Sequence, residues 1–419
     1  MFEFGRDLRK LFTQARESED LSWLELIGVD LLAGEARQQT TDAGRVSCAK
    51  PHAAWLRASA LWREHARRAG AADSLDRALK AAHDAARLSR SADETARAAV
   101  ERAQTLLLRF DLCGGRAVLD QAAEAVPGCA APCRPSTLAA IAAVHARIRA
   151  RQARLSDRPE ALMDAAALLD ASIHGLEGRP ACEIDDIRME RAALALEAGV
   201  ARRDPHLLDQ AGRELQGLVQ AASPDYRPLT RARALTLCGA GLSALAVLAD
   251  DARAREQGRV MFDAAADQFT PDHSPLDWVV IQIVRAAAPG AVRIESLRQA
   301  EALTRDHDLV LGALARDLLI ESEVASATSQ GDLAALTVIE ASVRHRLADR
   351  RRRSSGLDWA VDQIAMARLA AACVGLTGLP ASGYAGLALL EAAEAARDHG
   401  ALAIAARAEA LVQALAVRA

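Results

Sequence analysis

Helix-start signals recur along this chain at nearly constant intervals. Each signal is a Pro or a small residue placed just before a run of apolar residues with helical spacing. The signals stand at Pro51, Ser91, Pro135, Pro180, Pro228, Pro275 and Gly356. The steps between them are 40, 44, 45, 48, 47 and 81 residues, and the last is nearly two steps. A period of roughly 34–48 residues is typical of arrays of stacked helix pairs.

Each period contains two amphipathic patterns. In the fourth period the run Cys182–Ala201 has an apolar stripe with steps of four, three and four residues. Asp204 and Pro205 then end this run, as the N-cap and first residue of a second helix. The signal missing from the last long step is expected near Asp306–Ala315, where an apolar helical pattern restarts. Short connections make neighbouring helices antiparallel.

Composition agrees with closely packed helices. Hydrophobic residues form 51% of the chain, with Ala contributing much of that share, and aromatic residues only 3%. A β protein needs more β-branched and aromatic residues than this. We therefore predict an all-α fold, a right-handed α-α superhelix of about eight antiparallel helix pairs spanning residues 46–419.

The first 45 residues differ from the array. They contain Phe2, Phe4 and Phe12, three of the six Phe residues of the chain. We interpret residues 1–45 as an N-terminal helical cap followed by a linker at Glu35–Ser47. The alternative is an amphipathic segment in which these Phe side chains dock on a partner or a membrane surface.

One short phrase occurs twice, 81 positions apart: SPLDWVVIQI from Ser274 and SGLDWAVDQI from Ser355. We interpret its shared positions as structural marks of the repeat; they are Asp277, Trp278, Gln282, Asp358, Trp359 and Gln363. Each Asp stands where an N-cap is expected, and each Gln lies one turn after its Trp. The Trp side chains are expected to fill gaps between helix pairs. A ligand-facing role is the alternative.

The second copy of the phrase carries a family resemblance. The stretch LDWAVDQIAMARLAAACVGLTG (Leu357–Gly378) resembles divergent bacterial tetratricopeptide repeats, through Trp359, Ala360 and Gln363. The copy at Trp278 is similar, with Val279 in place of the Ala. The resemblance implies a superhelix that binds a protein or peptide on its concave face, usually without catalysis.

An arginine cluster is the strongest local charge. It lies within RHRLADRRRR, and its arginines are Arg344, Arg346, Arg350, Arg351, Arg352 and Arg353. Arg binds carboxylate and phosphate groups bidentately, so this cluster could contact an acidic partner segment. The alternative is a solvated helix end, where cations also favour the helix dipole.

Paired carboxylates raise an alternative from another class. Asp185–Asp186 and Asp250–Asp251 are adjacent acids on expected helices. Such pairs hold magnesium and diphosphate in all-α lyases and transferases. The simpler interpretation is solvated helix charges, because such enzymes also need an aromatic-lined cavity. Similarly, Cys129 and Cys133 are expected to be ordinary thiols, since no second ligand pair supports a zinc site. A reversible disulfide between them is the alternative.

These observations favour a non-enzymatic scaffold that binds a protein or peptide, without a cofactor or metal. The alternative is a regulatory or sensor module that binds a small ligand or an anionic segment. The net charge of −4 does not favour nucleic acid or anionic membranes as partners. The apolar stretch Ala234–Ala249 is shorter than a membrane span, and we expect it to be buried on most sides. Seven scattered Cys residues indicate a reducing cytoplasm. Homo-oligomerisation stays open.

Overall fold

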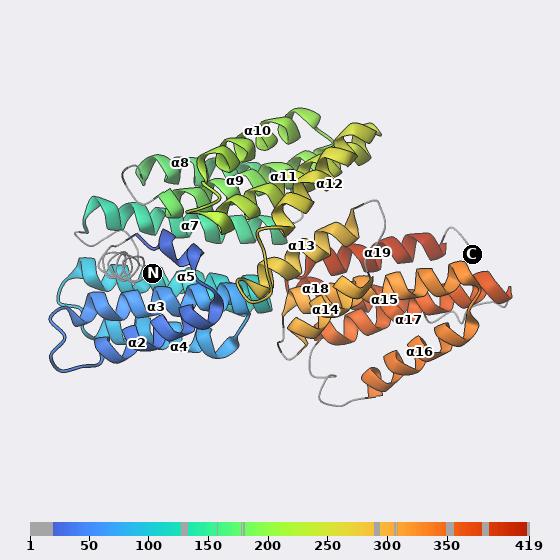
Figure 1. The fold of residues 1–419 in the computed structure, drawn as a ribbon, viewed down its shortest axis with the longest axis horizontal. Helices are drawn as coiled ribbons and strands as arrows, with labels where there is room; N and C mark the ends of the chain where they lie inside the picture. The colour runs from blue at the N-terminus through green and yellow to red at the C-terminus, as the bar shows by residue number, and fades with distance from the viewer. Residues whose placement is uncertain are drawn as a thin grey trace, which may run out of the picture. The chain divides into compact units, whose positions relative to one another are not determined.

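The computed structural model describes residues 20–126, 133–156, 158–176, 178, 181–288, 294–305, 307, 309–348, 356–378 and 385–416 (Figure 1). Within these ranges the regular elements are all helices, and no strand occurs. The short 3-10 helix η1 (Ser22–Leu26) comes first and is followed by α-helices. The predicted all-α fold class is therefore confirmed.

Two kinds of α-helix alternate along the chain. Helices of one kind, which we call the first helices, begin at the recurrent signals or, for α15, at the expected restart. The first helices are α3 (Pro51–Ala69), α5 (Ala92–Cys113), α7 (Pro135–Leu155), α9 (Ala181–Arg202), α11 (Pro228–Ala249), α13 (Pro275–Ala287), α15 (Val310–Gln330) and α17 (Gly356–Thr377). The helices that follow them are α4 (Ala72–Arg87), α6 (Arg116–Ala125), α8 (Pro159–Gly175), α10 (Pro205–Ala221), α12 (Ala252–Ala266), α14 (Ile294–Thr304), α16 (Leu333–Ala348) and α18 (Ala385–Asp398). Helix α2 (Val29–Ala43) precedes the array and α19 (Leu402–Ala416) ends it.

The predicted start signals coincide with observed helix starts. All seven stand at the first residue of a first helix or directly before it. The start predicted for α10 is also observed, because the Asp204 side chain accepts hydrogen bonds from the backbone N–H groups of His206 and Leu207. These caps satisfy N–H groups that have no partner inside the helix. The signals therefore mark the repeat period correctly.

Small residues set the spacing between neighbouring helices. Gly239 on α11 faces the Phe262 ring on α12, and a Cβ at Gly239 would lie 2.5 Å from the Phe262 Cε1 atom. Ala192, Ala198 and Ala211 are fully buried where α9 packs against α8 and α10. Side chains of this size let helix axes approach closely. The high Ala content therefore belongs to the helix interfaces.

The chain forms two compact units. The described residues of unit 1 fall within 20–105 and 122–281, and those of unit 2 within 106–121 and 282–419. Helices α2–α4 and α7–α12 belong to unit 1 and α14–α19 to unit 2, whereas α5, α6 and α13 each have residues in both. The predicted domain boundary at residue 45 stays a prediction.

The expected linker at Glu35–Ser47 is wrong for its first part, because α2 continues to Ala43. Tertiary contacts hold this helix against α3. Gln39 Nε2 donates to the Ala54 carbonyl at 3.2 Å, and Trp62 Nε1 donates to Thr40 Oγ1 at 2.9 Å. Polar, weakly helix-forming residues such as Thr40 thus remain helical through contacts that local propensity does not report.

Arg–carboxylate pairs join successive first helices. The pairs are Arg63–Glu101, Arg147–Glu190, Arg154–Glu197, Arg233–Asp277 and Arg316–Asp358. Their partners are 38, 43, 43, 44 and 42 residues apart. These separations match the repeat period, so each pair links equivalent faces of neighbouring repeats.

The repeated phrase takes part in this pairing through its Asp. Asp277 is the third residue of α13 and not its N-cap, since the Ser274 carbonyl accepts the first helical hydrogen bond, from the N–H of Trp278. Asp358 is likewise the third residue of α17. The expected N-cap role of both Asp residues is therefore wrong. Both carboxylates instead bind an Arg of the preceding first helix in the same unit.

The other marks of the phrase are less equivalent. Trp278 and Trp359 are both half-buried, and Trp359 packs against the α17–α19 core. Gln282 is buried, whereas Gln363 is half-buried. In the first copy Val279 and Ile281 are fully buried, and so is Ser274.

Among the residues that the structure describes, two helices are long and apolar enough to cross a membrane, α11 and α17. In each, 44% of the most apolar window is buried inside the protein. The C-terminal end of α11 exposes Val247 and Leu248, so the expectation that Ala234–Ala249 is buried on most sides holds only for its first half. The absence of a membrane span stays a prediction.

Candidate functional site

A short segment before α2 lies inside unit 1. This segment, residues 20–28, which we call the docking segment, consists of η1 and its flanking residues. In Figure 1 it is the dark-blue stretch that lies among the first helices, between α3 and the layer of α7 and α9. Its Leu24 and Ile27 side chains are buried and pack against Leu32, Leu61 and Trp62. Their burial provides the apolar part of its anchoring.

Arg68 on α3 binds the backbone of the docking segment. Its side chain is fully buried. Nη1 donates to the Ile27 carbonyl and Nη2 to the Leu24 carbonyl, each at 2.9 Å, and Nε donates to Glu64 Oε1 at 2.7 Å. Burial lowers the pKa of Arg68, but a guanidinium titrates so high that it stays charged. A buried charge needs these partners, because an unpaired one costs several kcal/mol.

Glu64 supplies the counter-charge. Burial alone would raise its pKa, but the guanidinium groups of Arg67, Arg68 and Arg233 hold the pKa of this carboxyl well below its usual range. Glu64 therefore stays ionised. The two Arg–Glu64 contacts fix the direction of the Arg68 fork toward the docking segment.

Glu25 of the docking segment binds the N-terminus of α11. Its carboxylate is buried and accepts hydrogen bonds from the backbone N–H of Thr230 at 2.8 Å and from Thr230 Oγ1 at 2.5 Å. Arg227 Nε lies 3.5 Å from Glu25 Oε1. Free N–H groups and the positive end of the dipole make a helix N-terminus favourable for a carboxylate. The arrangement is a site for one acidic side chain.

The loop between α12 and α13 closes the other side. His273 Nε2 donates to the Glu25 carbonyl at 2.8 Å, and the Val29 N–H donates to the Asp272 carbonyl at 3.4 Å. A Cβ at Gly28 would lie 3.1 Å from the Asp272 carbonyl oxygen, so Gly permits this close approach. Burial lowers the pKa of His273, which is therefore neutral near pH 7.

The start of the docking segment covers a thiol on α9. Cys182 Sγ donates to Asp20 Oδ1 at 3.5 Å. Burial, together with the nearby Asp20 carboxylate, raises the pKa of Cys182 to about 12. Reactivity toward electrophiles requires the thiolate, so Cys182 is protected while Asp20 is in place.

Ion pairs between distant first helices surround this segment. Arg227 on the α11 side binds Asp185 of α9 at 2.5 Å, and Arg67 of α3 lies 3.6 Å from Asp186 of α9. The first helices α3, α9 and α11 therefore face a common interior. Sequence reasoning did not find Arg68, Glu25 or His273, because no local pattern distinguishes them from surface charges.

The predicted partner-binding residues fall in two groups. Phe2, Phe4, Phe12 and Arg350–Arg353 lie outside the described residues. Arg344 is exposed and pairs with Glu340 at 2.6 Å. Arg346 is mostly buried and donates from Nε to the buried Asp362 carboxylate at 2.9 Å. Arg346 thus has an internal partner, and a binding role for the cluster stays a prediction.

The carboxylate pairs have structural partners. Asp185 and Asp186 bind arginines of other first helices, as described above. Asp250 ends α11 and is exposed, and Asp251 caps α12 by accepting from the N–H groups of Arg253 and Ala254. Among the described residues no group of three or more His, Cys, Asp or Glu could hold a metal ion.

The two cysteines of the loop after α6 are only partly described. Cys129 lies outside the described residues. Cys133 is a half-buried free thiol.

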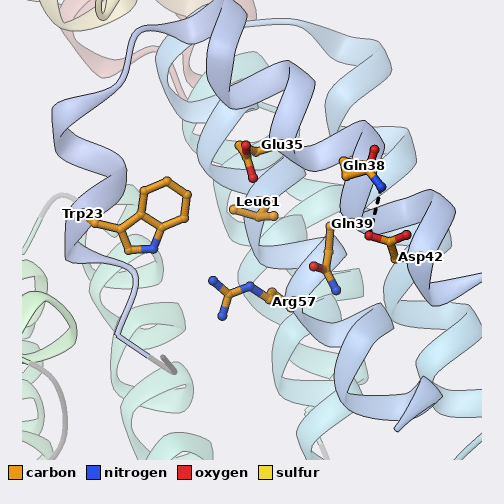
Figure 2. A pocket seen from close by; sticks show the side chains of 7 residues that line it. All are labelled: Trp23, Glu35, Gln38, Gln39, Asp42, Arg57 and Leu61. Carbon is orange, nitrogen blue, oxygen red and sulfur yellow. Dashed lines mark hydrogen bonds between the residues drawn. The ribbon is translucent and has the colours of Figure 1, made fainter. Parts of the chain in front are cut away.

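A small polar cavity lies beside the docking segment. It has a volume of about 300 Å³. Figure 2 shows Trp23 of the docking segment on one side and α2 and α3 on the other. Its lining residues are Trp23, Glu35, Gln38, Gln39, Asp42, Arg57 and Leu61. The cavity therefore depends on the docking segment for one wall.

By sequence, no family model and no curated protein matches the chain. Among solved structures it is similar to a Rap protein complexed with competence and sporulation factor, with a TM-score of 0.49 and 10% sequence identity. That similarity covers 88% of this chain and 98% of the other.

Proposed function

We propose that this chain is a non-enzymatic, cytoplasmic scaffold that binds a protein or peptide segment along the inner face of unit 1. We define this inner face by Arg68, Arg227 and Thr230 of the first helices and by His273 of the adjoining loop. The proposal includes a right-handed, tetratricopeptide-like superhelix of about eight antiparallel helix pairs. Helices that alternate with a period of 40–48 residues between adjacent signals support this architecture.

One observation carries the functional proposal. The inner face already holds the docking segment, a short stretch of chain outside the α-helices, through a guanidinium fork on two backbone carbonyls and a helix N-terminus on one carboxylate. Hydrogen bonds to main-chain carbonyls do not depend on the side chains of the bound segment. Specificity then comes from the carboxylate site and the apolar contacts, which is how peptide-recognition surfaces commonly divide the task.

The proposal is tested by mapping where a partner binds. The full-length chain is used to capture a partner from a cell lysate, the complex is cross-linked, and the cross-linked residues are identified by mass spectrometry. We expect cross-links on the inner face and on the first helices α3, α9 and α11. Arg259 on α12 is exposed and is not part of the inner face, so the control variant Arg259→Ala should capture the partner as well as the unmodified chain does. Cross-links confined to α4, α8, α10 and α12 would refute the proposed face.

A further inference from the structure

We propose that the docking segment is a displaceable ligand of its own chain, and that the inner face binds partner peptides with an acidic residue between two aliphatic residues. The inference rests on the proposed function and specifies its partner. The bound stretch defines the pattern, aliphatic–acidic–any–aliphatic, at Leu24, Glu25, Leu26 and Ile27.

Each position of this pattern has a distinct environment. The first and last side chains are buried at 2% and 4% exposure, in the apolar cluster with Leu61 and Trp62. The acidic position meets the N–H and hydroxyl groups of Thr230. The third position, Leu26, is 47% exposed, so it does not restrict the side chain. A ligand must therefore supply an aliphatic side chain at the first and last positions and an acidic one at the second, whereas the third position accepts any side chain.

Charge requires that this site always holds a ligand. Two of the three hydrogen-bond partners of the Arg68 guanidinium are carbonyls of the docking segment, and the Arg68 side chain has no exposure of its own. Loss of the segment without replacement would leave a buried cation with Glu64 alone. A partner peptide restores the same carbonyl contacts. The docking segment thus leaves by exchange with a partner and not by simple opening.

The docking segment can be exchanged because it lies outside the α-helices of the array. Besides the hydrogen bonds within η1, the segment has internal bonds from the Leu24 N–H to the Leu21 carbonyl at 3.0 Å, from the Ile27 N–H to the Leu24 carbonyl at 3.3 Å and from the Ser22 N–H to the Asp20 carboxylate at 2.9 Å. No first helix includes any of its residues, so its departure breaks no helix of the array. Gly28 joins it to α2 and is the residue at which the chain can change direction.

Direct binding to the full-length chain tests the inference. The probe is a fluorescent peptide of the sequence SWLELIGV, and the control peptide has Gln in place of its Glu. In the variant Glu25→Gln, the docking segment loses the carboxylate charge that contacts the N-terminus of α11. We expect this variant to bind the probe about tenfold more tightly than the unmodified chain. Adding Thr230→Val should remove that gain. Equal affinity of both chains, or equal binding of both peptides, would overturn the inference.

Alkylation of Cys182 provides a second measurement without any substitution. Asp20 leaves Cys182 when the segment is displaced, and the probe lacks an equivalent residue. Excess probe should therefore accelerate modification of Cys182 in the unmodified chain. Cys373 on α17 is the matched control, a half-buried thiol in unit 2 whose rate should not change. An unchanged rate at Cys182 under saturating probe would refute displacement, even if Glu25→Gln failed to fold.

The outcomes separate this inference from the proposed function. A partner cross-linked to the inner face whose sequence lacks the acidic pattern would keep the scaffold and reject the pattern. A dimer that depends on concentration and on Glu25 would assign the site to the docking segment of a second copy, which would overturn the inference of a separate partner. Light scattering across a concentration series distinguishes the two cases.

Discussion

Arg233 on α11 donates two hydrogen bonds to Asp277 on α13, from Nε at 2.9 Å and from Nη2 at 2.5 Å. The second copy of the repeated phrase has the equivalent contact, between Arg316 on α15 and Asp358 on α17. In both copies the Arg precedes the Asp by about one repeat period. The Asp that both copies of the phrase share therefore joins neighbouring repeats, which gives the repeated phrase a structural function.

Asp277→Asn and Asp358→Asn should each destabilise the unit that contains them. Either change leaves a mostly buried Arg without its carboxylate, and we expect a loss of about 2–4 kcal/mol. Thermal unfolding should show the first variant lowering the melting temperature of unit 1 and the second that of unit 2. Asp263→Asn breaks an exposed pair with Arg259 and should cost much less, because solvent screens exposed charges. Equal effects of Asp277→Asn and Asp263→Asn would contradict this account.

A fully buried Asp links three helices in unit 2. Asp317 on α15 has no exposure and accepts hydrogen bonds from Arg368 on α17 and Arg407 on α19. Asp317→Ala leaves both cations with only Glu321 nearby, so it should cost about 3–5 kcal/mol. Urea unfolding measures the change.

The matched control for Asp317 is an exposed pair in the same unit. Arg397 and Glu409 join α18 and α19 at the surface. Arg397→Ala should change the free energy of unfolding by less than about 1 kcal/mol, because solvent screens exposed ion pairs. A small effect of Asp317→Ala would mean that the buried cluster rearranges without cost.

The helices were largely predictable from the sequence, whereas the candidate site was not. Helix starts depend on local chemistry, such as the carboxylate of Asp204 and the fixed backbone of Pro205, so their signals are readable in order along the chain. Arg68 and Thr230 are 162 residues apart, and each contacts the docking segment only because the packing of unit 1 brings α3 and α11 to it. The residues that flank Arg68 and Thr230 in the sequence carry no pattern that predicts these contacts.

Gly114 at the turn between α5 and α6 should not accept a larger residue. Its φ is +75°, and a Cβ there would collide with the His399 carbonyl oxygen of the loop between α18 and α19. Gly331 after α15 has a similar φ of +67°, but a Cβ there would meet no atom within 4 Å. Gly331→Ala should therefore cost only the left-handed strain, about 1–2 kcal/mol.

Gly114→Ala should cost clearly more than Gly331→Ala, because it adds a collision with backbone to the same strain. Chemical unfolding of both variants compares the two costs in one unit. Equal losses would show that the His399 loop moves away freely, and that the hydrogen bond from the Gly115 N–H to the His399 carbonyl contributes little.

Unit 1 should become less stable as the pH falls below the ordinary titration range of His. Burial lowers the pKa of His273 in the folded protein, so the unfolded chain binds a proton at a higher pH than the folded one. The stability associated with neutral His273 is therefore present above about pH 6.5 and is lost as the pH falls through the folded pKa. His65 on α3 has a pKa lowered by burial too and contributes in the same direction.

The substitution His273→Gln isolates the effect of one imidazole. Gln keeps a donor for the Glu25 carbonyl but does not titrate. We expect the difference in melting temperature between pH 7.5 and pH 5.5 to be smaller in this variant, with the remainder due to His65. The exposed His174 is the control, and His174→Gln should leave the pH dependence unchanged. An identical pH profile in His273→Gln and the unmodified chain would show that protonation of His273 does not oppose docking of residues 20–28.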